Sequence, residues 1–374
     1  MTQPTNFGFG DECALLKDSA RKFFAEHLPV DRLHALVAAH PDPEAPSGAP
    51  WRDDLWPAMV ELGWTALAIP ESAGGLGLPA VAVAGLMEEH GRAAFPGPLA
   101  ATLATSYVLA AADSGTAALE EIAAGRSATL AFANAAGSWH AGDSPVSARG
   151  GRLSGTACFV QEPRKAERLL VAAQDEGGLG LYWIASDAAG VTVAPDTIVD
   201  LTRDQGRVSF EEAVAEPAGR NGLAAFHAAM PALWTLLAAD MVGAGEWQLQ
   251  TTVEYAQARK QFDRPLGFFQ AVKHQLVDVM TRVDESKSLL YHAACALDHE
   301  PEKALQLAHM AKASASDMAA FASGRSVQCH GGIGFTWECY VHLYFKRQKH
   351  SEVLWGDGAW HRARLADILL GEVA

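Results

Sequence analysis

The N-terminal third of the chain carries apolar residues at helical spacing. Two such faces, within the stretch from Glu12 to Ala124, are formed by Ala14, Leu15, Ala20, Phe23 and Phe24 and by Leu55, Met59 and Leu62. Recurrence every three or four positions is typical of amphipathic α-helices. A Pro- and Gly-rich stretch, His40–Pro50, interrupts the pattern and predicts a loop. We therefore expect an all-helical N-terminal domain.

The period of the pattern changes near Gly125. Short segments rich in Val, Leu, Thr and aromatic residues follow, separated by Gly, Asp and Pro. These segments are 128–133, 152–160, 169–173, 179–185, 191–194 and 206–210. Short runs bounded by turn residues predict β-strands. We predict a small antiparallel β-barrel here, with a β-sandwich as the alternative.

A helical pattern returns from Gly222 to the end of the chain. The expected helices are 225–261, 269–297, 300–332 and 358–370. Antiparallel helices joined by short loops form bundles. The chain is therefore predicted to be an α+β multidomain protein. Its parts are an all-α domain over 1–125, a middle antiparallel β-barrel over 126–220 and a C-terminal four-helix bundle over 221–374.

Composition and charge narrow the function classes. The 374 residues carry a formal charge of −15 with no clustered Lys and Arg, which excludes a nucleic-acid footprint. Five cysteines without C-x-x-C spacing suggest neither a disulfide framework nor a zinc site. The N-terminus lacks the pattern of a signal peptide, and no apolar run approaches the roughly 20 residues of a membrane span. We expect a cytoplasmic protein with reduced thiols, no metal and no membrane span.

Two runs in the C-terminal third carry the most information. Arg259–Gln270 reads R-K-Q-F-D-R-P-L-G-F-F-Q, and Gln328–Phe335 reads Q-C-H-G-G-I-G-F. They resemble the R-x-Q-F-G-x-P-[IL]-x-x-F-Q and Q-x-x-G-G-x-G-[FY] elements of acyl-CoA dehydrogenases. Pro70–Gly77, P-E-S-A-G-G-L-G, is similar to a third element of that family. The order helical, β, helical is also that of the acyl-CoA dehydrogenase fold, so the resemblance covers essentially the whole chain.

The resemblance implies FAD as cofactor. Its pyrophosphate, adenosine and flavin ring require a cation, hydrogen-bonding side chains, aromatic rings and close backbone approach. The residues that match the family's cofactor contacts are Arg259, Gln261, Phe262, Phe269, Gln270, Gln328, Gly331 and Gly332. In the family these elements reach the flavin of a neighbouring subunit. Asp263 replaces a family glycine, and Asp tolerates a left-handed backbone better than most residues.

The sheet region keeps little of the family's flavin-ring contacts. Of the T-E-P-x-x-G-S-D element, only Gly137 and Ser138 remain. Trp139 and Trp183 are aromatic residues able to stack on a flat group, and ordinary packing is the alternative for them. The subunit's own wall for the flavin ring is therefore in doubt.

The family's catalytic glutamate is absent at both places where the family keeps it. Desaturation needs a carboxylate to remove the α-proton while hydride leaves from the β-carbon. Aligning Arg362 with a family arginine puts Trp355 at the first place, and counting back from Tyr255 puts Leu233 and Trp234 at the second. The catalytic base is thus unknown. Asp357 is a weak candidate, two residues beyond the first place.

The ending L-W-G-D-x-x-x-H-R, Leu354–Arg362, resembles the smaller subunits of heterotetrameric (α2β2) dehydrogenases that act on steroid side-chain CoA thioesters. The implied partners are an acyl-CoA substrate, a homologous subunit that carries the catalytic glutamate, and an electron-transferring flavoprotein. The alternatives are a homo-oligomeric dehydrogenase or oxidase with a relocated base, and a non-enzymatic scaffold.

Acyl-chain specificity stays open at this point. Ala238, Ala239, Gly243 and Gly245 are small residues in the first bundle helix. They either leave room for a bulky acyl group or let helices pack closely.

Overall fold

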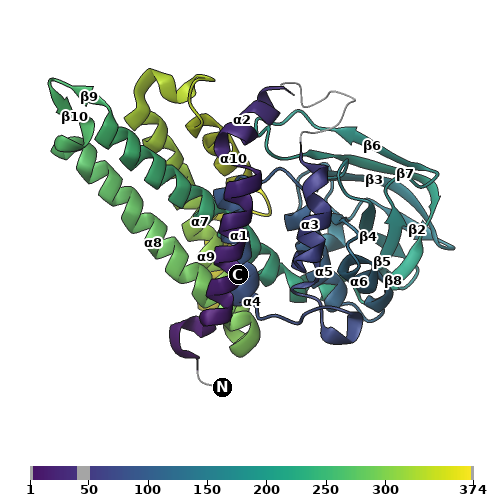
Figure 1. Ribbon diagram of the computed structural model, residues 1–374. Coiled ribbons are helices and arrows are strands. Elements are labelled where there is room, and N and C mark those ends of the chain that lie inside the picture. The colour runs from purple at the N-terminus through teal and green to yellow at the C-terminus, as the bar shows by residue number, and fades with distance from the viewer. Residues whose placement is uncertain (1–2, 40–50, 372–374) are drawn as a thin grey trace. The chain divides into compact units, whose positions relative to one another are not determined.

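The computed structural model describes residues 3–39 and 51–371, which form two compact units (Figure 1). The helical unit comprises Met1–Ala38, Ala80–Phe95 and Trp234–Ala374, and the sheet unit comprises Ala39–Pro79 and Pro96–Leu233. The loop predicted over His40–Pro50 lies outside the described residues. The three-domain division at 125 and 220 stays a prediction.

The N-terminal third is helical, as predicted. Its α-helices are α1 Asp11–His27, α2 Val30–Ala38, α3 Trp56–Glu61, α4 Ala80–Arg92, α5 Leu99–Ala110 and α6 Thr116–Ala123. Helices α1, α2 and α4 belong to the helical unit, and the other three to the sheet unit. Ala20 and Phe24 of α1 are buried, but Leu15 is 70% exposed, so the predicted apolar face was one residue too wide.

A single open sheet forms the middle of the chain (Figure 1). Its strands are β1 Ala128–Ala131, β2 Ser147–Arg149, β3 Arg152–Gln161, β4 Arg168–Asp175, β5 Gly178–Ala185, β6 Val191–Pro195, β7 Gln205–Val214 and β8 Glu216–Gly219. The order is β6-β7-β3-β2-β4-β5-β8, with β1 paired to β4. The pairs β1–β4 and β2–β4 are parallel.

The predicted closed, wholly antiparallel barrel is therefore wrong. Within the described residues, the edge strands β6 and β8 pair with one neighbour each, β7 and β5, and not with each other. An alternating pattern predicts strands but not which strands pair, and closure depends on pairing between the two edges. β7 alternates between buried and exposed positions, whereas 169–173 of β4 are buried without interruption. Such a run marks a strand that is covered on both faces.

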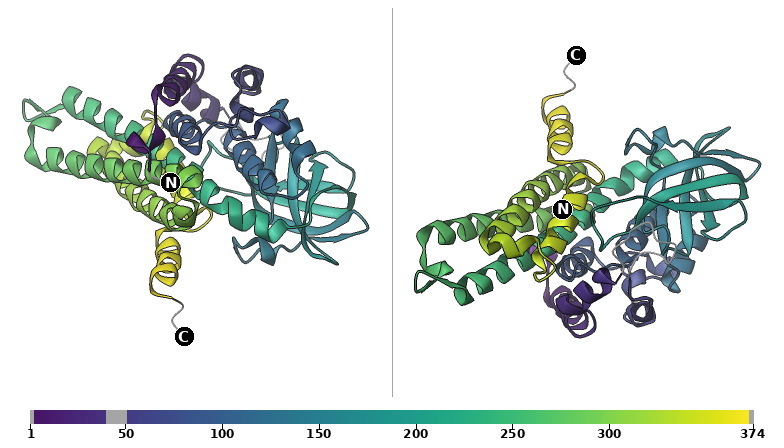
Figure 2. Two further views of the ribbon diagram at one scale, coloured as in Figure 1. Left: turned by 90° about the horizontal axis from the view of Figure 1, so that it is seen from below. Right: turned by 90° about the horizontal axis from the view of Figure 1, so that it is seen from above.

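Five α-helices follow residue 221 in the described part of the chain. They are α7 Gly222–Ala258, α8 Gln270–His299, α9 Pro301–His330, α10 Val341–Val353 and α11 Gly358–Leu370. By length and composition α7 is apolar enough to cross a membrane, but 78% of its most apolar window is buried, which is typical of a core helix. The end of α11 projects from the rest of the helical unit (Figure 2).

Helix α10 was not predicted because most of the residues that it buries are polar: His342, Arg347, Gln348, His350 and Ser351, beside Val341, Leu343 and Tyr344. Arg347 is fully buried, and its Nη2 donates to Asp240 Oδ1 of α7 over 2.5 Å. The same carboxylate oxygen lies 2.9 Å from Nδ1 of the buried His90 in α4. Charged residues are seldom buried unless they are paired. The apolar periodicity that marks other helices is therefore missing from this one.

Helices α4 and α7 cross with backbone against backbone. A Cβ on Gly91 would collide with the carbonyl of Asp240, and a Cβ on Gly243 would collide with the carbonyl of Glu88. A Cβ on Gly245 would meet the Met318 sulfur at 2.6 Å. Of the two readings of these small residues, close packing accounts for Gly243 and Gly245.

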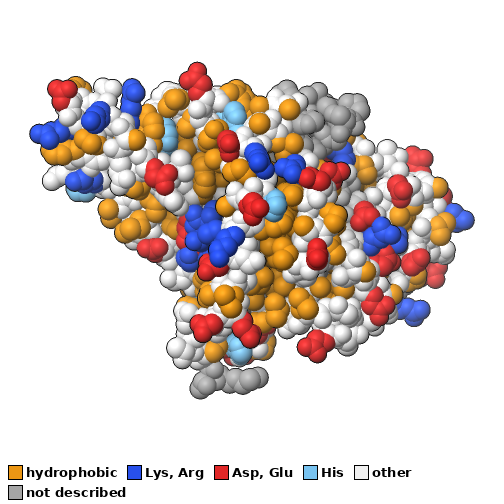
Figure 3. Space-filling model, in the orientation of Figure 1, with side chains coloured by type: hydrophobic (Ala, Val, Ile, Leu, Met, Phe, Trp, Pro, Cys, Tyr) orange, Lys and Arg blue, Asp and Glu red, His pale blue; other side chains and the backbone are white. Residues whose placement is uncertain are grey.

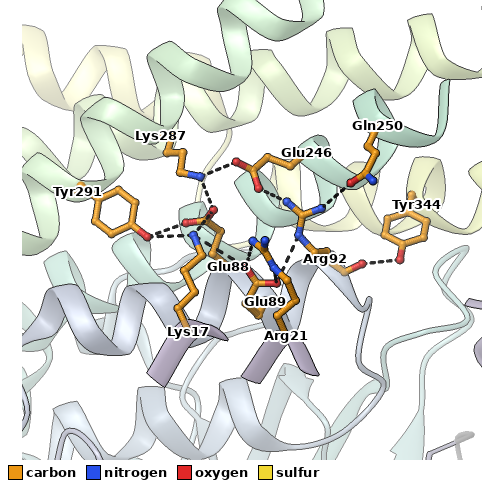
Figure 4. Close-up of polar contacts among 10 residues, drawn as sticks. All are labelled: Lys17, Arg21, Glu88, Glu89, Arg92, Glu246, Gln250, Lys287, Tyr291 and Tyr344. Atoms are coloured by element: carbon orange, nitrogen blue, oxygen red, sulfur yellow. Dashed lines mark hydrogen bonds and ion pairs between the residues drawn. The ribbon is translucent and has the colours of Figure 1, made fainter. Parts of the chain in front are cut away.

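A network of charges centred on Glu88 connects the helices beside that crossing (Figure 4). Glu88 is fully buried, and its Oε1 lies 2.6 Å from Lys17 Nζ of α1 and 2.7 Å from Lys287 Nζ of α8. Tyr291 of α8 donates a hydrogen bond to its other oxygen over 2.8 Å. Burial alone would raise the pKa of Glu88, but the two lysines outweigh burial and lower it to about 2.

Glu88→Gln should destabilise the helical unit. The variant leaves two lysines beside a neutral amide, and breaking a buried ion pair costs about 3 kcal/mol or more at pH 7. The wild-type carboxylate contributes stability above a pH of about 4.5 and loses that contribution as the pH falls toward 2. Urea unfolding at several pH values should show a flatter acid limb for the variant. Glu12→Gln, on the exposed side of α1, is the matched control. Equal unfolding free energies for the two variants at pH 7 would contradict this role.

Candidate functional site

The first signature run begins where α7 ends. Arg259 follows the last helical residue, and its N–H still donates to the carbonyl of Tyr255 over 2.8 Å. The chain then turns back in a hairpin, β9 Lys260–Gln261 and β10 Arg264–Pro265, and enters α8 at Gln270. Pairing of Gln261 with Arg264 leaves a two-residue turn. The run is therefore a rigid connection between two long helices.

Phe262 and Asp263 occupy that turn in left-handed conformations. Their φ angles are +51° and +59°. Two-residue hairpins favour this geometry because it matches the twist of the strands. The expectation that Asp263 tolerates a left-handed backbone in place of glycine is confirmed. Phe262 is 87% exposed, so an aromatic ring is held outside the protein on a backbone that aromatic residues seldom adopt.

The second signature run forms the end of α9. Gln328 is exposed in the last turn, and Gly331 and Gly332 open the 3-10 helix η7, Gly331–Phe335. Gly331 has a φ of +68°, and a Cβ on either glycine would meet no atom within 4 Å. Open space above two adjacent glycines lets a ligand approach the backbone closely.

The structure brings the two runs to the same end of the helical unit. The rings of Tyr255 in α7 and His330 in α9 stack with centroids 4.3 Å apart. The hydroxyls of Thr252 and Ser326, one turn earlier on each helix, lie 2.8 Å apart. Residues far apart in the sequence thus become neighbours through a polar contact between helix ends.

The predicted cofactor residues share an exposed surface. Phe269 is half-buried, whereas the other seven are exposed: Arg259, Gln261, Phe262, Gln270, Gln328, Gly331 and Gly332. Lys and Arg side chains gather around the β9–β10 hairpin (Figure 3), where Lys260 and Arg264 accompany Arg259. A guanidinium, several amides and open glycine backbone suit a pyrophosphate, so this donor set fits FAD.

Both places of the missing glutamate are filled by buried apolar or aromatic side chains. Leu233 is fully buried, and Trp234 and Trp355 are 6% and 8% exposed. Trp234 Nε1 donates to the carbonyl of Trp355 over 3.1 Å. Asp357, the weak candidate base, caps α11, and its carboxylate accepts from the Trp360 N–H over 2.7 Å. The Asp357 carboxylate is thus engaged with the backbone of its own helix.

At Ser138, Trp139 and Trp183 the sheet unit has few groups left to contact a flat ligand. Ser138 donates its hydroxyl to Asp143 over 2.6 Å. Trp183 is 4% exposed, and its indole N–H donates to Glu121 over 3.1 Å. Trp139 packs edge-on against Phe159, with centroids 5.9 Å apart. For Trp139 and Trp183, ordinary packing accounts for the contacts.

Sequence reasoning missed a cluster of titratable groups under the C-terminal loop. His309 and His361 are buried with their Nδ1 atoms 2.8 Å apart. Burial, with Arg364 nearby, lowers the pKa of His309 to about 4, and burial, with Lys312 nearby, lowers that of His361 to about 2. Lys312 lies on the same helix as His309 and is also buried. His361 belongs to the L-W-G-D-x-x-x-H-R ending, but His309 and Lys312 lie about fifty residues earlier and no motif marks them, so the sequence did not indicate the cluster.

Comparison with known proteins agrees with this geometry. The family model for the N-terminal domain of acyl-CoA dehydrogenases matches residues 10–131, and that for the C-terminal domain matches residues 220–370. Acyl-CoA dehydrogenase IpdE2 of Mycobacterium tuberculosis is 34% identical over 346 residues, which cover 92% of this chain and 93% of that protein. The chain belongs to the acyl-CoA dehydrogenase family. Membership supports an oxidoreductase that acts on an acyl-CoA.

Other acyl-CoA dehydrogenase relatives are similar over most of the chain. FadE34 of Mycobacterium tuberculosis is 30% identical over 83% of this chain and 41% of its own length. A solved structure described as the Tcur3481-Tcur3483 steroid ACAD G363A variant is 29% identical, with a TM-score of 0.85, and the match covers 97% of this chain and 98% of that one. The ChsE4-ChsE5 complex from Mycobacterium tuberculosis shares the fold at 23% identity and a TM-score of 0.84, over 99% of this chain and 100% of that one.

Asp263→Gly should strengthen the hairpin of this acyl-CoA dehydrogenase. Glycine adopts a positive φ without a Cβ penalty, which should stabilise the turn by about 0.5 kcal/mol. The Leu266 N–H, which donates to the carbonyl of Arg259 over 2.8 Å, reports on the turn through its hydrogen exchange. Exchange should slow in Asp263→Gly and quicken in Asp263→Ala. The same exchange rate in both variants would show that the left-handed backbone carries no cost here.

Proposed function

We propose that this chain is the subunit without the catalytic base in a heteromeric acyl-CoA dehydrogenase. One observation carries the proposal: cofactor-type residues converge on an exposed end, while both places of the family's base are sealed by buried Leu233, Trp234 and Trp355. In this role, the chain supports FAD at a surface shared with a homologous subunit. That subunit supplies the glutamate.

The exposure of the cofactor residues supports a shared site. Phe262, Phe268, Phe335 and Trp337 are 87%, 56%, 63% and 44% exposed. They flank Arg259 and the glycines of the second run in the sequence. Contiguous exposed aromatic residues mark interaction surfaces in soluble proteins. A partner that covers these rings would exclude water from the cofactor while the cationic and amide groups hold it.

A second apolar surface suits an oligomer. Ile368, Leu369 and Leu370 are 42%, 60% and 78% exposed on α11, which projects from the helical unit (Figure 2). Only Gly358 and His361 of this helix are buried. An isolated helix of this length is marginal in water without tertiary packing. Contact with a neighbouring subunit would cover this face.

The cofactor and the residues of this chain would have different roles in the reaction. When bound, the flavin of FAD accepts the hydride that leaves the β-carbon of the acyl group. Arg259 would neutralise the pyrophosphate, and Gln270 and Gln328 would hydrogen-bond to the cofactor. Gly331 and Gly332 would admit it to the backbone. The α-proton would be removed by a carboxylate of the partner.

The names of similar proteins guide the choice of substrate and electron acceptor. The solved structure at 29% identity is described as a steroid ACAD, and its name joins Tcur3481 and Tcur3483. We extend this to a steroid-type acyl-CoA thioester as substrate and to an electron-transferring flavoprotein as acceptor of the electrons. We propose the cytoplasm as the compartment.

A self-sufficient homo-oligomer is the competing function, and Asp357 is its candidate base. The role of Asp357 as the cap of α11 counts against it, because its carboxylate is already engaged by the Trp360 N–H over 2.7 Å. A non-enzymatic scaffold is the third reading. The open, cationic surface of the two runs counts against a scaffold, because a scaffold does not require these residue types.

The visible spectrum of the protein, alone and co-expressed with a glutamate-bearing homologue, tests these readings. The complex should be yellow, and a steroid-type acyl-CoA should bleach its flavin band. The chain alone should be colourless or should not bleach. Bleaching of the chain alone that is lost in Asp357→Asn would favour the self-sufficient enzyme. Absence of flavin in every complex would favour the scaffold.

Arg259→Ala should weaken FAD binding by the complex about tenfold or more, because a charge-assisted hydrogen bond to phosphate is lost. Lys260→Ala, exposed on the same hairpin, is the matched control and should bind FAD as the wild type does. Flavin retention after ultrafiltration measures the difference. Equal retention in the two variants would remove Arg259 from the proposed site.

A further inference from the structure

Lys312 is a fully buried lysine in the middle of α9. Its Nζ lies within hydrogen-bond distance of three acceptors. It donates to Ser316 Oγ over 3.0 Å, to the carbonyl of Glu352 over 3.1 Å and to the carbonyl of Gly356 over 2.8 Å. An ammonium has three N–H donors, so these acceptors satisfy it completely.

The two carbonyls flank an unusual piece of backbone. Glu352 lies in the last turn of α10, and Gly356 precedes the cap of α11. Between them, Trp355 has a φ of +55°, and Gly356 itself has a φ of +104°. A left-handed tryptophan persists only where surrounding contacts fix it. Lys312 supplies two of these contacts, and Trp234 supplies a third through the carbonyl of Trp355.

The electrostatic surroundings explain why a lysine can be buried here. The carbonyl end of α10 carries the negative end of a helix dipole, and the carboxylates of Glu352 and Asp357 also favour the ammonium. His309 on the same helix and His361 of α11 are the nearby titratable groups of the cluster. Burial outweighs the attraction and lowers the pKa of Lys312 to about 7.

We propose that Lys312 is a positioning residue, whose bonds to the carbonyls of Glu352 and Gly356 fix the connection between α10 and α11 and thereby hold Trp355 in place. Trp355 stands where the family keeps a base. This tie, the pair of hydrogen bonds from Lys312 to the carbonyls of Glu352 and Gly356, depends only on contacts within the helical unit. Its consequence, that an indole fills this place in the shared site, rests on the proposed function.

Protonation gives the tie a signature in the pH dependence of stability. The unfolded chain keeps this lysine charged up to a pH of about 10.5, whereas the folded chain releases the proton above about 7. Because the unfolded state then binds more protons, this group makes stability rise with pH between those values. A lysine whose pKa is the same in both states makes no such contribution.

Lysine NMR on the wild-type chain tests the tie without any variant. One lysine side chain should titrate near neutral pH, and the amide signals of residues 353–358 should shift in the same titration. If those amide signals do not follow the titration of any lysine side chain, the proposal is overturned.

Lys312→Met removes the donors while it keeps the length of the side chain. Amide exchange over 353–358 should quicken about tenfold relative to the wild type, because the carbonyls of Glu352 and Gly356 each lose a hydrogen bond from the ammonium. The rise of unfolding free energy above pH 7 should also flatten. Lys22→Met is the control, since Lys22 lies at an exposed position of α1. It should leave exchange and pH slope unchanged.

Exchange within twofold of the wild type in Lys312→Met, with an unchanged pH slope, would overturn the positioning role. If this variant does not fold, the wild-type titration still decides. None of these measurements uses flavin, so a chain that binds no FAD still answers them. The flavin spectrum of the complex tests the proposed function separately.

Discussion

The ion pairs of Glu88 are the interaction on which the helical unit depends. A carboxylate buried without partners would lose its charge, so Lys17 and Lys287 must lie within contact distance of it. This requirement fixes α1 and α8 against α4, next to the crossing where Gly91 and Gly243 bring α4 and α7 together. These contacts fix the positions of α7 and α8 within the helical unit. The connection between their ends, which carries the first signature run, is held in place from the interior.

The cofactor-type surface follows from that arrangement. Once α7 and α9 are in register, Tyr255 stacks on His330, and the two runs emerge side by side. Most of the cofactor-type side chains are exposed, so this surface does not enclose a ligand within the chain. In the proposed function another chain completes this site, and the buried Trp234 and Trp355 support that proposal. A cofactor surface and a missing base would be compatible within one such subunit.

The loop between α10 and α11 holds Trp355 on a backbone with a positive φ, at a place where the family resemblance leads one to expect the base. The loop has to be held in that shape by other groups, and Lys312, Trp234 and the cap at Asp357 do so. Polar groups that would suggest catalysis in another protein here hold the loop backbone in place through hydrogen bonds. Asp357 was a candidate base from its position in the sequence, and its contacts explain its presence in another way.

The sequence by itself determined the helical N-terminal third, six of the eight strands of the sheet, four of the five C-terminal helices and the family signatures, because each is encoded by local spacing or by contiguous residues. It did not determine closure of the sheet, since β6 and β8 each pair with a single neighbour and strand patterns do not encode pairing. Helix α10 was not predicted, because its buried Arg347 is paired with the carboxylate of Asp240 on α7. The roles of Lys312, His309 and His361 were likewise decided by tertiary structure alone. The buried charges of Glu88 and Arg347 are stabilised by partners that are distant in the sequence, and only folding brings these groups together.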